Sequence, residues 1–346
     1  MAPLRVALVG CGTVALGQHL PGYRALGRDR VDVTVFQSRS PASAEAARLA
    51  WGSGETVPDW RQAILRDDVD AVDVCTPNAL HAEIAVAAAR AGRHVLVEKP
   101  LATTLDDAER MLAAAAAART VLMTAHNGRY APAIRAARAA VAAGRVGEVT
   151  AVEAWLGHGG PEGWAPRATW FLAPETAGGG ALIDLGVHLV DNVRYVTGDE
   201  FAVVAAMRSD RQGGVERNGH VLFRLERGAV GSLKASWNTP YGSGRALVLW
   251  GRTGEVSVDR SGAWLRTGAG TVALAAEPAA DLYDDFVRAC RGEGPAVPGG
   301  EDGLAALAVV LAAYASEATA TFVRPSGGRN RAPGNESSDQ VRVPNR

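Results

Sequence analysis

The chain has 346 residues, of which 47% are hydrophobic and 21% are charged. This length exceeds what one compact core usually holds, so we expect two domains. A formal net charge of −1 gives no indication of binding to nucleic acid or to an anionic membrane, where a clustered basic surface is expected. The three cysteines are widely spaced and fit neither a disulfide framework nor a metal cluster, and the N-terminus carries no leader-like apolar run. The composition therefore predicts a soluble, cytoplasmic protein.

The first third of the chain alternates two kinds of segment. Short, valine-rich apolar runs are typical of parallel strands buried on both faces, and they occupy residues 4–9, 31–36, 70–75, 94–97 and 120–124. Alanine-rich segments of helical length separate them, at residues 14–25, 42–50, 80–91 and 105–118. This alternation predicts an α/β domain with a doubly wound parallel sheet over residues 1–124.

The remaining sequence predicts an α+β domain over residues 125–324. Expected strands, mostly separated by Gly and Asn/Asp turns, occupy residues 148–156, 203–209, 220–225, 230–237, 245–250 and 255–259. Expected helices occupy residues 132–142, 181–197, 282–290 and 303–319. A large, open, mostly antiparallel sheet needs a cover, so we expect a homodimer or homotetramer. Residues 325–346 have almost no apolar side chains, which predicts a disordered tail.

A glycine-rich turn follows the first expected strand and opens the first expected helix. It reads Gly10-Cys11-Gly12-Thr13-Val14-Ala15. Gly10 permits the tight turn, Gly12 lets the backbone approach a pyrophosphate, and Ala15 keeps helix and strand close together. Free N–H groups and the dipole at the helix N-terminus favour the anion. In this strand–turn–helix context the six residues predict dinucleotide binding.

The end of the second expected strand bears on the choice of cofactor. An acidic residue there would bind the ribose 2′-hydroxyl of NAD, whereas an arginine accommodates the 2′-phosphate of NADP. The sequence has Ser38 and Arg39 and no carboxylate at this point. Arg39 can bind a phosphate with its charged fork, although a solvated loop arginine would look the same. We favour NADP(H) and keep NAD(H) open.

Two further loops leave the carboxyl ends of expected strands, where ligands bind in such sheets. The first contains Thr76, Pro77, Asn78 and His81, which either contact the nicotinamide ribose or cap the next helix. The second contains Glu98 and Lys99 directly after the run 94–97. A lysine there is costly unless it is paired, so it is either part of an ion pair or a proton donor and acceptor whose pKa burial lowers.

Three glycines, Gly178 to Gly180, precede a helical segment that bears Asp184 and His188. The four-residue spacing places Asp184 and His188 on one face of an α-helix. Glycines allow a substrate or cofactor to approach the backbone. The pair could also be an exposed ion pair, but apolar residues surround it in the sequence, so we expect a buried functional pair.

Taken together, these motifs resemble the glucose-fructose oxidoreductase, inositol dehydrogenase and rhizopine-catabolism (Gfo/Idh/MocA) family. The resemblance rests on GCGTVA, the TPN–H loop, the EKP triplet and GGGALIDLGVH, and it runs from about residue 4 to residue 324. It implies a Rossmann domain followed by a domain with an open sheet, assembled as dimers or tetramers. It also implies that Lys99, Asp184 and His188 form the catalytic set. The acidic residue common in NAD-using members is absent near Ser38.

The resemblance implies hydride transfer between nicotinamide C4 and a carbinol or keto carbon of a sugar, nucleotide sugar or cyclitol. A protonated lysine can polarise the carbonyl, so we expect no metal. To the cofactor-binding residues above we add Glu98, Lys99, Asn127 and Trp170. Aromatic faces pack on sugar rings, so candidates for the substrate wall, each of which could equally be a core or interface residue, are Trp155, His158, Trp164, Arg167, Trp170 and Tyr283. Three alternatives stay open: an NAD-dependent glycosidase of the same family, an imine reductase, and a non-enzymatic dinucleotide-binding sensor.

Overall fold

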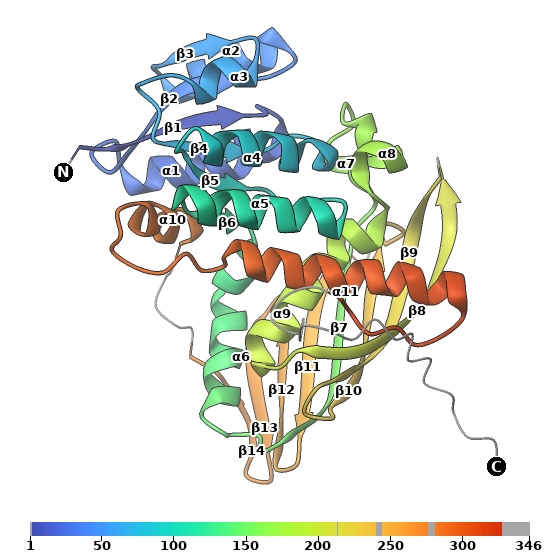
Figure 1. Cartoon of the computed structure of the whole chain (residues 1–346). Helices are drawn as coiled ribbons and strands as arrows, with labels where there is room; N and C mark the ends of the chain where they lie inside the picture. The colour runs from blue at the N-terminus through green and yellow to red at the C-terminus, as the bar shows by residue number, and fades with distance from the viewer. Residues whose placement is uncertain (1, 213, 240–243, 276–280, 327–346) are drawn as a thin grey trace.

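The N-terminal part of the computed structural model is a six-stranded parallel sheet with helices on both faces (Figure 1). The structure describes residues 2–212, 214–239, 244–275 and 281–326. The strands are β1 (Leu4–Val9), β2 (Val31–Gln37), β3 (Glu55–Val57), β4 (Ala71–Val74), β5 (His94–Val97) and β6 (Leu122–Thr124). Their order, β3-β2-β1-β4-β5-β6, is that of a doubly wound Rossmann sheet and confirms the expected fold.

The helices of this part match the alanine-rich segments, with one change at the first of them. They are η1 (Ala15–His19), α1 (Leu20–Leu26), α2 (Pro41–Trp51), α3 (Trp60–Ile64), η2 (Asn78–Leu80), α4 (His81–Arg90) and α5 (Leu105–Ala118). Side-chain oxygens of Ser40, Asp59 and Thr104 accept backbone N–H groups and thereby fix the starts of α2, α3 and α5. The first helix begins with the π-helical turn η1 instead of running as one α-helix.

A second sheet of eight strands follows, in the order β14-β13-β12-β11-β7-β10-β9-β8. The strands are β7 (Val149–Gly157), β8 (Phe201–Gln212), β9 (Val215–Leu225), β10 (Val230–Ser236), β11 (Gly244–Gly251), β12 (Gly254–Asp259), β13 (Gly262–Thr267) and β14 (Gly270–Ala273). Every recorded pairing is antiparallel except that of β10 with β7. The mostly antiparallel sheet is confirmed, and β13 and β14 extend it beyond the expected strands.

Helices cover one face of this second sheet, on the side of the Rossmann sheet (Figure 1). The elements that connect or cover the two sheets are η3 (Asn127–Tyr130), α6 (Pro132–Ala142), α7 (Pro161–Trp164), η4 (Thr169–Leu172), α8 (Pro174–Ala177), η5 (Leu182–Gly186), α9 (Val187–Thr197), α10 (Leu282–Cys290) and α11 (Gly300–Thr319). Helices α6, α9 and α11 pack on the sheet, and α11 also packs on α5. No described helix covers the opposite face of the sheet.

Two C-terminal helices tie the domains together. Helix α10 packs in the N-terminal core, because Phe286 and Val287 lie in the same buried cluster as β1. A boundary at residue 125 stays a prediction, but α10 belongs with the Rossmann part. Helix α11 is long and apolar enough to cross a membrane, yet it is a core helix, since Gly303 lies so close to Thr124 that a Cβ there would meet the Thr124 hydroxyl at 2.3 Å. The predicted disordered tail lies outside the described residues from residue 327 onward.

Candidate functional site

The glycine turn after β1 has the geometry that a dinucleotide requires. Gly10 has φ +96°, and a Cβ at this position would lie 2.4 Å from the carbonyl oxygen of Cys75, so only glycine fits. The N–H of Leu16 donates to the carbonyl of Gly12 at 3.0 Å, which marks the start of the helix. A Cβ at Gly12 would meet nothing within 4 Å, so the space beside the helix N-terminus is open. The turn therefore fits a pyrophosphate.

The side chains of the same turn point in different directions. Cys11 is buried, its thiol donates to the carbonyl of Gln37 at 3.3 Å, and burial raises its pKa to about 12. Ala15 is buried against the sheet, as expected. Thr13 is exposed and Val14 is half-buried. Cys11 can therefore contact a cofactor only through its backbone, whereas Thr13 offers a hydroxyl to the open space.

The residues expected to select the cofactor lie at the carboxyl end of β2. Ser38 is half-buried and its hydroxyl accepts the N–H of Ser40 at 3.3 Å, while Arg39 is exposed. Asn127, which follows β6, is exposed and its amide donates to Gln18 on η1 at 3.0 Å. These residues are accessible, and their role toward a cofactor stays a prediction.

The loop after β4 is fixed by bonds that sequence reasoning did not foresee. His81 is fully buried and its ring nitrogens face the carbonyl oxygens of Pro100 at 2.8 Å and Thr76 at 3.0 Å, while burial lowers its pKa. Asn78 donates to the carbonyl of Ala177 on α8 at 2.8 Å. The recorded contacts of both side chains are with protein, so they position the loop. The buried hydroxyl of Thr76 has no hydrogen-bond partner among the described residues, and its role toward a cofactor stays a prediction.

Lys99 and Asp184, 85 residues apart in sequence, form the centre of the candidate site. The Lys99 ammonium donates to Asp184 Oδ1 at 2.6 Å and to the Asp184 carbonyl at 3.0 Å. The other carboxylate oxygen accepts the indole N–H of Trp237 at 3.0 Å and lies 3.8 Å from Nε2 of His158. The side chain of Lys99 is 17% exposed and that of Asp184 is 6% exposed. The pair is therefore largely shielded from water, yet a ligand can still reach it.

His188 is buried in the first turn of α9, directly after the π-helical turn that holds Asp184. Successive side chains of a π-helix are spaced differently around the helix axis from those of an α-helix. The expected placement of Asp184 and His188 on one regular α-helical face is therefore altered. The carboxylate of Asp184 bonds Lys99 and Trp237. The carboxylate of Asp184 therefore fixes the position of the Lys99 ammonium in the structure.

The three glycines before this turn fit against protein rather than against a ligand. A Cβ at Gly180 would lie 1.9 Å from the carbonyl oxygen of Glu216 on β9, and one at Gly179 would lie 2.2 Å from the hydroxyl of Tyr314. The buried carboxylate of Glu216 accepts the N–H groups of Gly180 at 3.1 Å and Leu182 at 2.9 Å. The expectation that these glycines admit a substrate is corrected: they allow close packing, and Glu216 caps the helix start.

An aromatic cluster adjoins the carboxylate of Asp184. Trp170 stacks on Phe171 with ring centres 3.8 Å apart, and Phe171 meets the edges of Trp164 at 5.3 Å and Trp237 at 6.5 Å. His158 packs edge-on against Trp164 at 6.4 Å. Three members were expected from the sequence, whereas Phe171 and Trp237 were missed. A usable signal existed for Trp237, since it continues the buried alternation of β10.

The remaining candidates for the substrate wall lie elsewhere. Trp155 pairs with Lys234 across β7 and β10 and points to the face of the sheet away from the helices, and its role toward a substrate stays a prediction. Tyr283 is buried and packs edge-on against His19 and Tyr23, at 5.3 and 5.0 Å. That makes it a core residue of α10. Arg167 is exposed in the segment between α7 and η4.

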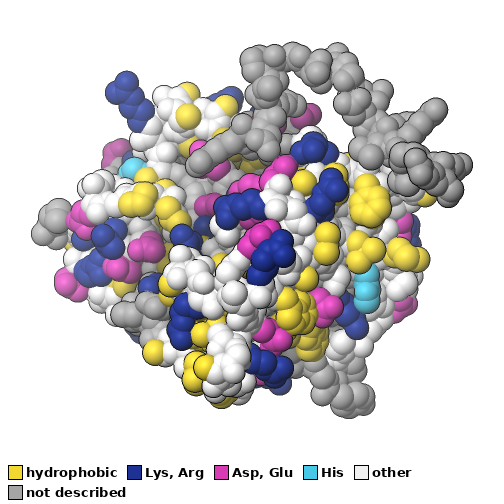
Figure 2. Space-filling view, turned by 90° about the horizontal axis from the view of Figure 1, so that it is seen from below, with side chains coloured by type: hydrophobic (Ala, Val, Ile, Leu, Met, Phe, Trp, Pro, Cys, Tyr) yellow, Lys and Arg dark blue, Asp and Glu magenta, His cyan; other side chains and the backbone are white. Residues whose placement is uncertain are grey.

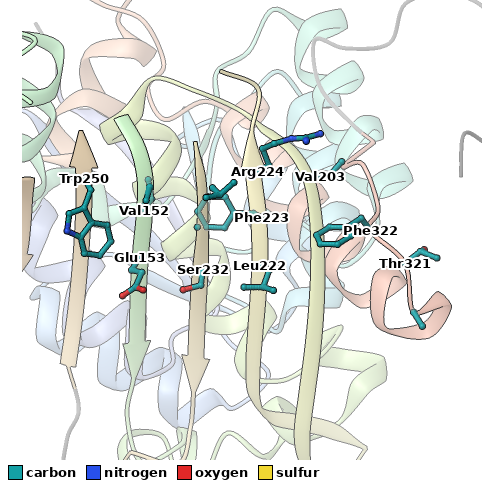
Figure 3. Close-up of a pocket in the computed structure, with 14 residues that line it drawn as sticks. Val152, Glu153, Val203, Leu222, Phe223, Arg224, Ser232, Trp250, Thr321 and Phe322 are labelled. Atoms are coloured by element: carbon teal, nitrogen blue, oxygen red, sulfur yellow. The ribbon is translucent and has the colours of Figure 1, made fainter. Parts of the chain in front are cut away.

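The uncovered face of the second sheet carries an apolar groove of about 780 Å³ (Figure 3). Adjacent strands contribute its side chains, with Trp250 on β11, Glu153 on β7, Ser232 on β10 and Leu222 on β9. Phe322, which follows α11, closes one end. Elsewhere, as in the view of Figure 2, acidic and basic side chains are interspersed with apolar ones. The groove is a second surface feature, separate from the Lys99 site.

Comparison with known proteins agrees with this geometry. Residues 4–126 match the model of the oxidoreductase family with an NAD-binding Rossmann fold, and residues 134–257 match the GFO/IDH/MocA C-terminal domain. The 1,5-anhydro-D-fructose reductase of Ensifer adhaerens is 35% identical over 91% of this chain and 96% of its own length. The levoglucosan dehydrogenase of Pseudarthrobacter phenanthrenivorans is 33% identical over 69% of this chain and 68% of its own length.

Solved structures agree in fold. A structure of levoglucosan dehydrogenase in complex with NADH and levoglucosan has a TM-score of 0.84 at 26% identity, covering 93% of this chain and 99% of that chain. The WlbA dehydrogenase from Bordetella pertussis, in complex with NADH and UDP-GlcNAcA, has a TM-score of 0.82 at 25% identity, covering 93% and 98%. The chain therefore belongs to the Gfo/Idh/MocA family of oxidoreductases.

Proposed function

We propose that this enzyme transfers a hydride between a nicotinamide dinucleotide and a carbinol or keto carbon of a sugar or polyol, with Lys99, Asp184 and His188 handling the proton. One observation carries the proposal. The Lys99–Asp184 pair, with Nζ and Oδ1 2.6 Å apart, follows β5 at the same carboxyl edge of the sheet as the open glycine turn. A cofactor on that turn would extend toward the pair, and the aromatic cluster would wall the space beside it.

The cofactor supplies the hydride when it is bound, and the chain's own residues do the rest. Asp184 holds the Lys99 ammonium by two bonds, at 2.6 and 3.0 Å, which keeps its remaining donor free to be directed at the reacting oxygen. That donor stabilises the developing charge on the oxygen during reduction. Positioned proton transfer of this kind contributes roughly 10²–10⁴-fold to the rate.

His188 is the second group proposed to exchange a proton with the substrate. It follows the turn that carries Asp184 and is buried, as a group that acts away from bulk water should be. The proposal assigns Lys99 and His188 to the two sides of the reacting oxygen. In oxidation one of them accepts the hydroxyl proton as hydride leaves, and in reduction it returns that proton.

The aromatic cluster supports a sugar or polyol as the substrate class. Trp237 donates to the carboxylate of Asp184, and Trp164 and Trp170 join it through Phe171. Flat apolar rings pack well against the C–H faces of sugars. The relatives named above are an anhydrofructose reductase and a levoglucosan dehydrogenase, which is consistent with a carbohydrate substrate. For the cofactor we propose NADP(H), because Ser38 and Arg39 stand where a ribose 2′-phosphate would lie.

A panel of free sugars, anhydrosugars, inositols and nucleotide sugars, each assayed with NAD(H) and NADP(H), tests this function. We expect net, stoichiometric change of the nicotinamide absorbance with at least one carbohydrate, together with a keto or hydroxy product. Cleavage of a glycoside with no net nicotinamide change would instead identify a glycosidase. Turnover confined to imines would identify an imine reductase, and binding without any turnover would identify a sensor.

We also propose that the open sheet face pairs with a second copy of the chain. The groove on this face is lined by apolar side chains such as Leu222 and Val230, which are 59% and 53% exposed in one copy. An exposed apolar surface over several strands is unfavourable in water and is typical of an interface. Packing two such faces together would bury these side chains in a homodimer or in half of a tetramer.

A further inference from the structure

A buried chain of charged groups lies behind Lys99 and is not explained by dinucleotide binding. His19, the last residue of η1, is fully buried between two carboxylates. Its Nδ1 lies 2.7 Å from Asp73 on β4, and its Nε2 lies 2.9 Å from Glu98, which follows β5. Three separate elements therefore place an imidazole between two acids in the core.

The geometry defines the charge of this imidazole. Both ring nitrogens face carboxylate oxygens, and a neutral imidazole has only one N–H to donate. Two good bonds to ionised carboxylates therefore need the protonated ring. Burial alone would lower the pKa of His19, but the charge of Asp73 raises it well above its usual value. Burial alone would raise the pKa of Glu98, and the bond from His19 lowers it. The imidazolium thus offsets part of the charge of the two buried carboxylates.

A metal ion bound by the same groups fits less well. His19, Asp73 and Cys75 offer ligand atoms within 4.8 Å of one another. However, Nδ1 of His19 and Oδ2 of Asp73 lie 2.7 Å apart, which is a hydrogen-bond distance. Two ligand atoms of one tetrahedral zinc ion lie roughly 3.3 Å apart, given bond lengths of about 2.0–2.1 Å. Burial also raises the pKa of the Cys75 thiol, which disfavours the thiolate that a metal needs.

The chain of bonds continues from Glu98 to Lys99. One oxygen of Glu98 is held by His19, and the other accepts the backbone N–H of Lys99 at 3.1 Å. The orientation of the Glu98 carboxylate thereby fixes the backbone from which the Lys99 side chain extends. That side chain reaches Asp184 at 2.6 Å. Tyr283 packs edge-on against the ring of His19, with ring centres 5.3 Å apart, and shields it from water. This contact explains the position of the buried tyrosine.

We propose that His19 is a positioning residue for the reaction: as an imidazolium between Asp73 and Glu98 it holds Glu98, and through Glu98 it sets the direction of Lys99. The inference rests on the proposed catalytic role of Lys99. It predicts that loss of the His19–Glu98 bond slows hydride transfer while leaving dinucleotide binding nearly intact. A displacement of a reacting group by about 1 Å costs on the order of 10²-fold in rate.

A double-mutant cycle of His19→Gln and Glu98→Gln tests the inference, with single-turnover hydride transfer, the dinucleotide Kd and the melting temperature measured on each protein. Each single variant should lower the transfer rate by about 10- to 100-fold. If His19 acts through Glu98, the two losses are not additive, and His19→Gln in the Glu98→Gln background changes the rate less than about threefold. Should His19→Gln fail to fold, Glu98→Gln alone must still show the rate loss per folded molecule at saturating dinucleotide.

His94→Gln is the matched control. His94 begins β5, at the other end of the strand that leads into Glu98, and its Nδ1 accepts the N–H of Val121 at 3.0 Å. This variant also loses a histidine bond and should lower the melting temperature, but its transfer rate per folded molecule should equal that of the wild type.

Three results would overturn the inference: a His19→Gln protein that is only less stable, as His94→Gln is; rate losses that add; or stoichiometric zinc in the purified protein that His19→Gln removes. Measuring Lys99→Met in parallel distinguishes an error in the role of His19 from an error in the proposed function. If Lys99→Met abolishes transfer while His19→Gln does not, only the role of His19 is wrong. If Lys99→Met has no effect, the catalytic role of Lys99 is wrong.

Discussion

At the scale of single residues, Asp184 links the chemistry to the stability of the site. It accepts the ammonium of Lys99 at 2.6 Å and the indole N–H of Trp237 at 3.0 Å, in surroundings that leave its side chain 6% exposed. Asp184→Ala would leave a buried cation without its partner. We expect it to lower the free energy of unfolding by about 3–5 kcal/mol, measured by denaturant titration.

Asp184→Asn is the informative companion, since its amide oxygen can still accept one bond. It should retain more of the stability than Asp184→Ala, yet transfer hydride more slowly than wild type because the ammonium is held less firmly. Equal stability of all three proteins would contradict the assigned ion pair.

The cofactor preference is a second prediction at this scale. Arg39 is exposed after β2, and an arginine at this point can bind the 2′-phosphate of the proposed NADP(H). Wild type should bind NADPH more tightly than NADH, and Arg39→Ala should reduce that preference by about tenfold or more, the worth of one charge-assisted bond. Binding titrations with both dinucleotides measure it. Equal or tighter binding of NADH by wild type would show that Ser38 and Arg39 do not select the phosphate.

Sequence patterns identified part of the site at this scale. Lys99 and Asp184 stood out because a charged residue in an apolar context is costly unless it is paired, and the structure brings the two together. The contacts of His19, Glu216 and Trp237 could not be found in this way, although the alternation of β10 indicated that Trp237 is buried. Each acts through a partner 34 to 79 residues away in the chain, and no local pattern encodes such a contact.

At the scale of secondary-structure elements, the helix start at Gly180 depends on close contact with β9. A Cβ at Gly180 would lie 1.9 Å from the carbonyl of Glu216, whereas one at Gly163 on α7 would meet nothing within 4 Å. Gly180→Ala should therefore destabilise the protein by about 1–3 kcal/mol through forced displacement of the backbone. Gly163→Ala, the control, should change the melting temperature little. Similar melting temperatures for the two variants would contradict the close packing of η5 on β9.

The elements themselves were predictable where burial creates a pattern. The valine-rich strands β1, β2, β4, β5 and β6 were expected from continuous apolar runs, because both faces of a central parallel strand are covered. Strands β3, β13 and β14 were missed; β3 and β14 have only three and four residues and mostly exposed side chains, whereas β13 has six residues of which two are buried. The π-helical turns η1 and η5 were also missed, because their backbone bonding leaves no mark in hydrophobic periodicity.

At the scale of the whole molecule, the open sheet face predicts self-association. Light scattering at micromolar concentration should report a dimer or tetramer. Leu222→Lys, which places a charge in the apolar groove of Figure 3, should shift the mass toward the monomer. Leu65→Lys is the control, since Leu65 is 70% exposed after α3 in the Rossmann part, and it should keep the assembly. A monomeric wild type, or two variants that behave alike, would show that this face is not the interface.

The central claim is that Lys99 handles the proton during hydride transfer, and one measurement tests it most directly. The chain offers a matched control in Lys234, an exposed lysine on β10 at the open face of the second sheet. Single-turnover hydride transfer, NADPH affinity and melting temperature are to be measured on Lys99→Met and Lys234→Met. We predict that Lys99→Met slows hydride transfer by about 10²-fold or more while dinucleotide binding persists, and that Lys234→Met transfers hydride at the wild-type rate. A Lys99→Met protein that is destabilised but transfers hydride at a near-normal rate per folded molecule would contradict the account, because Lys99 would then be only the structural partner of Asp184.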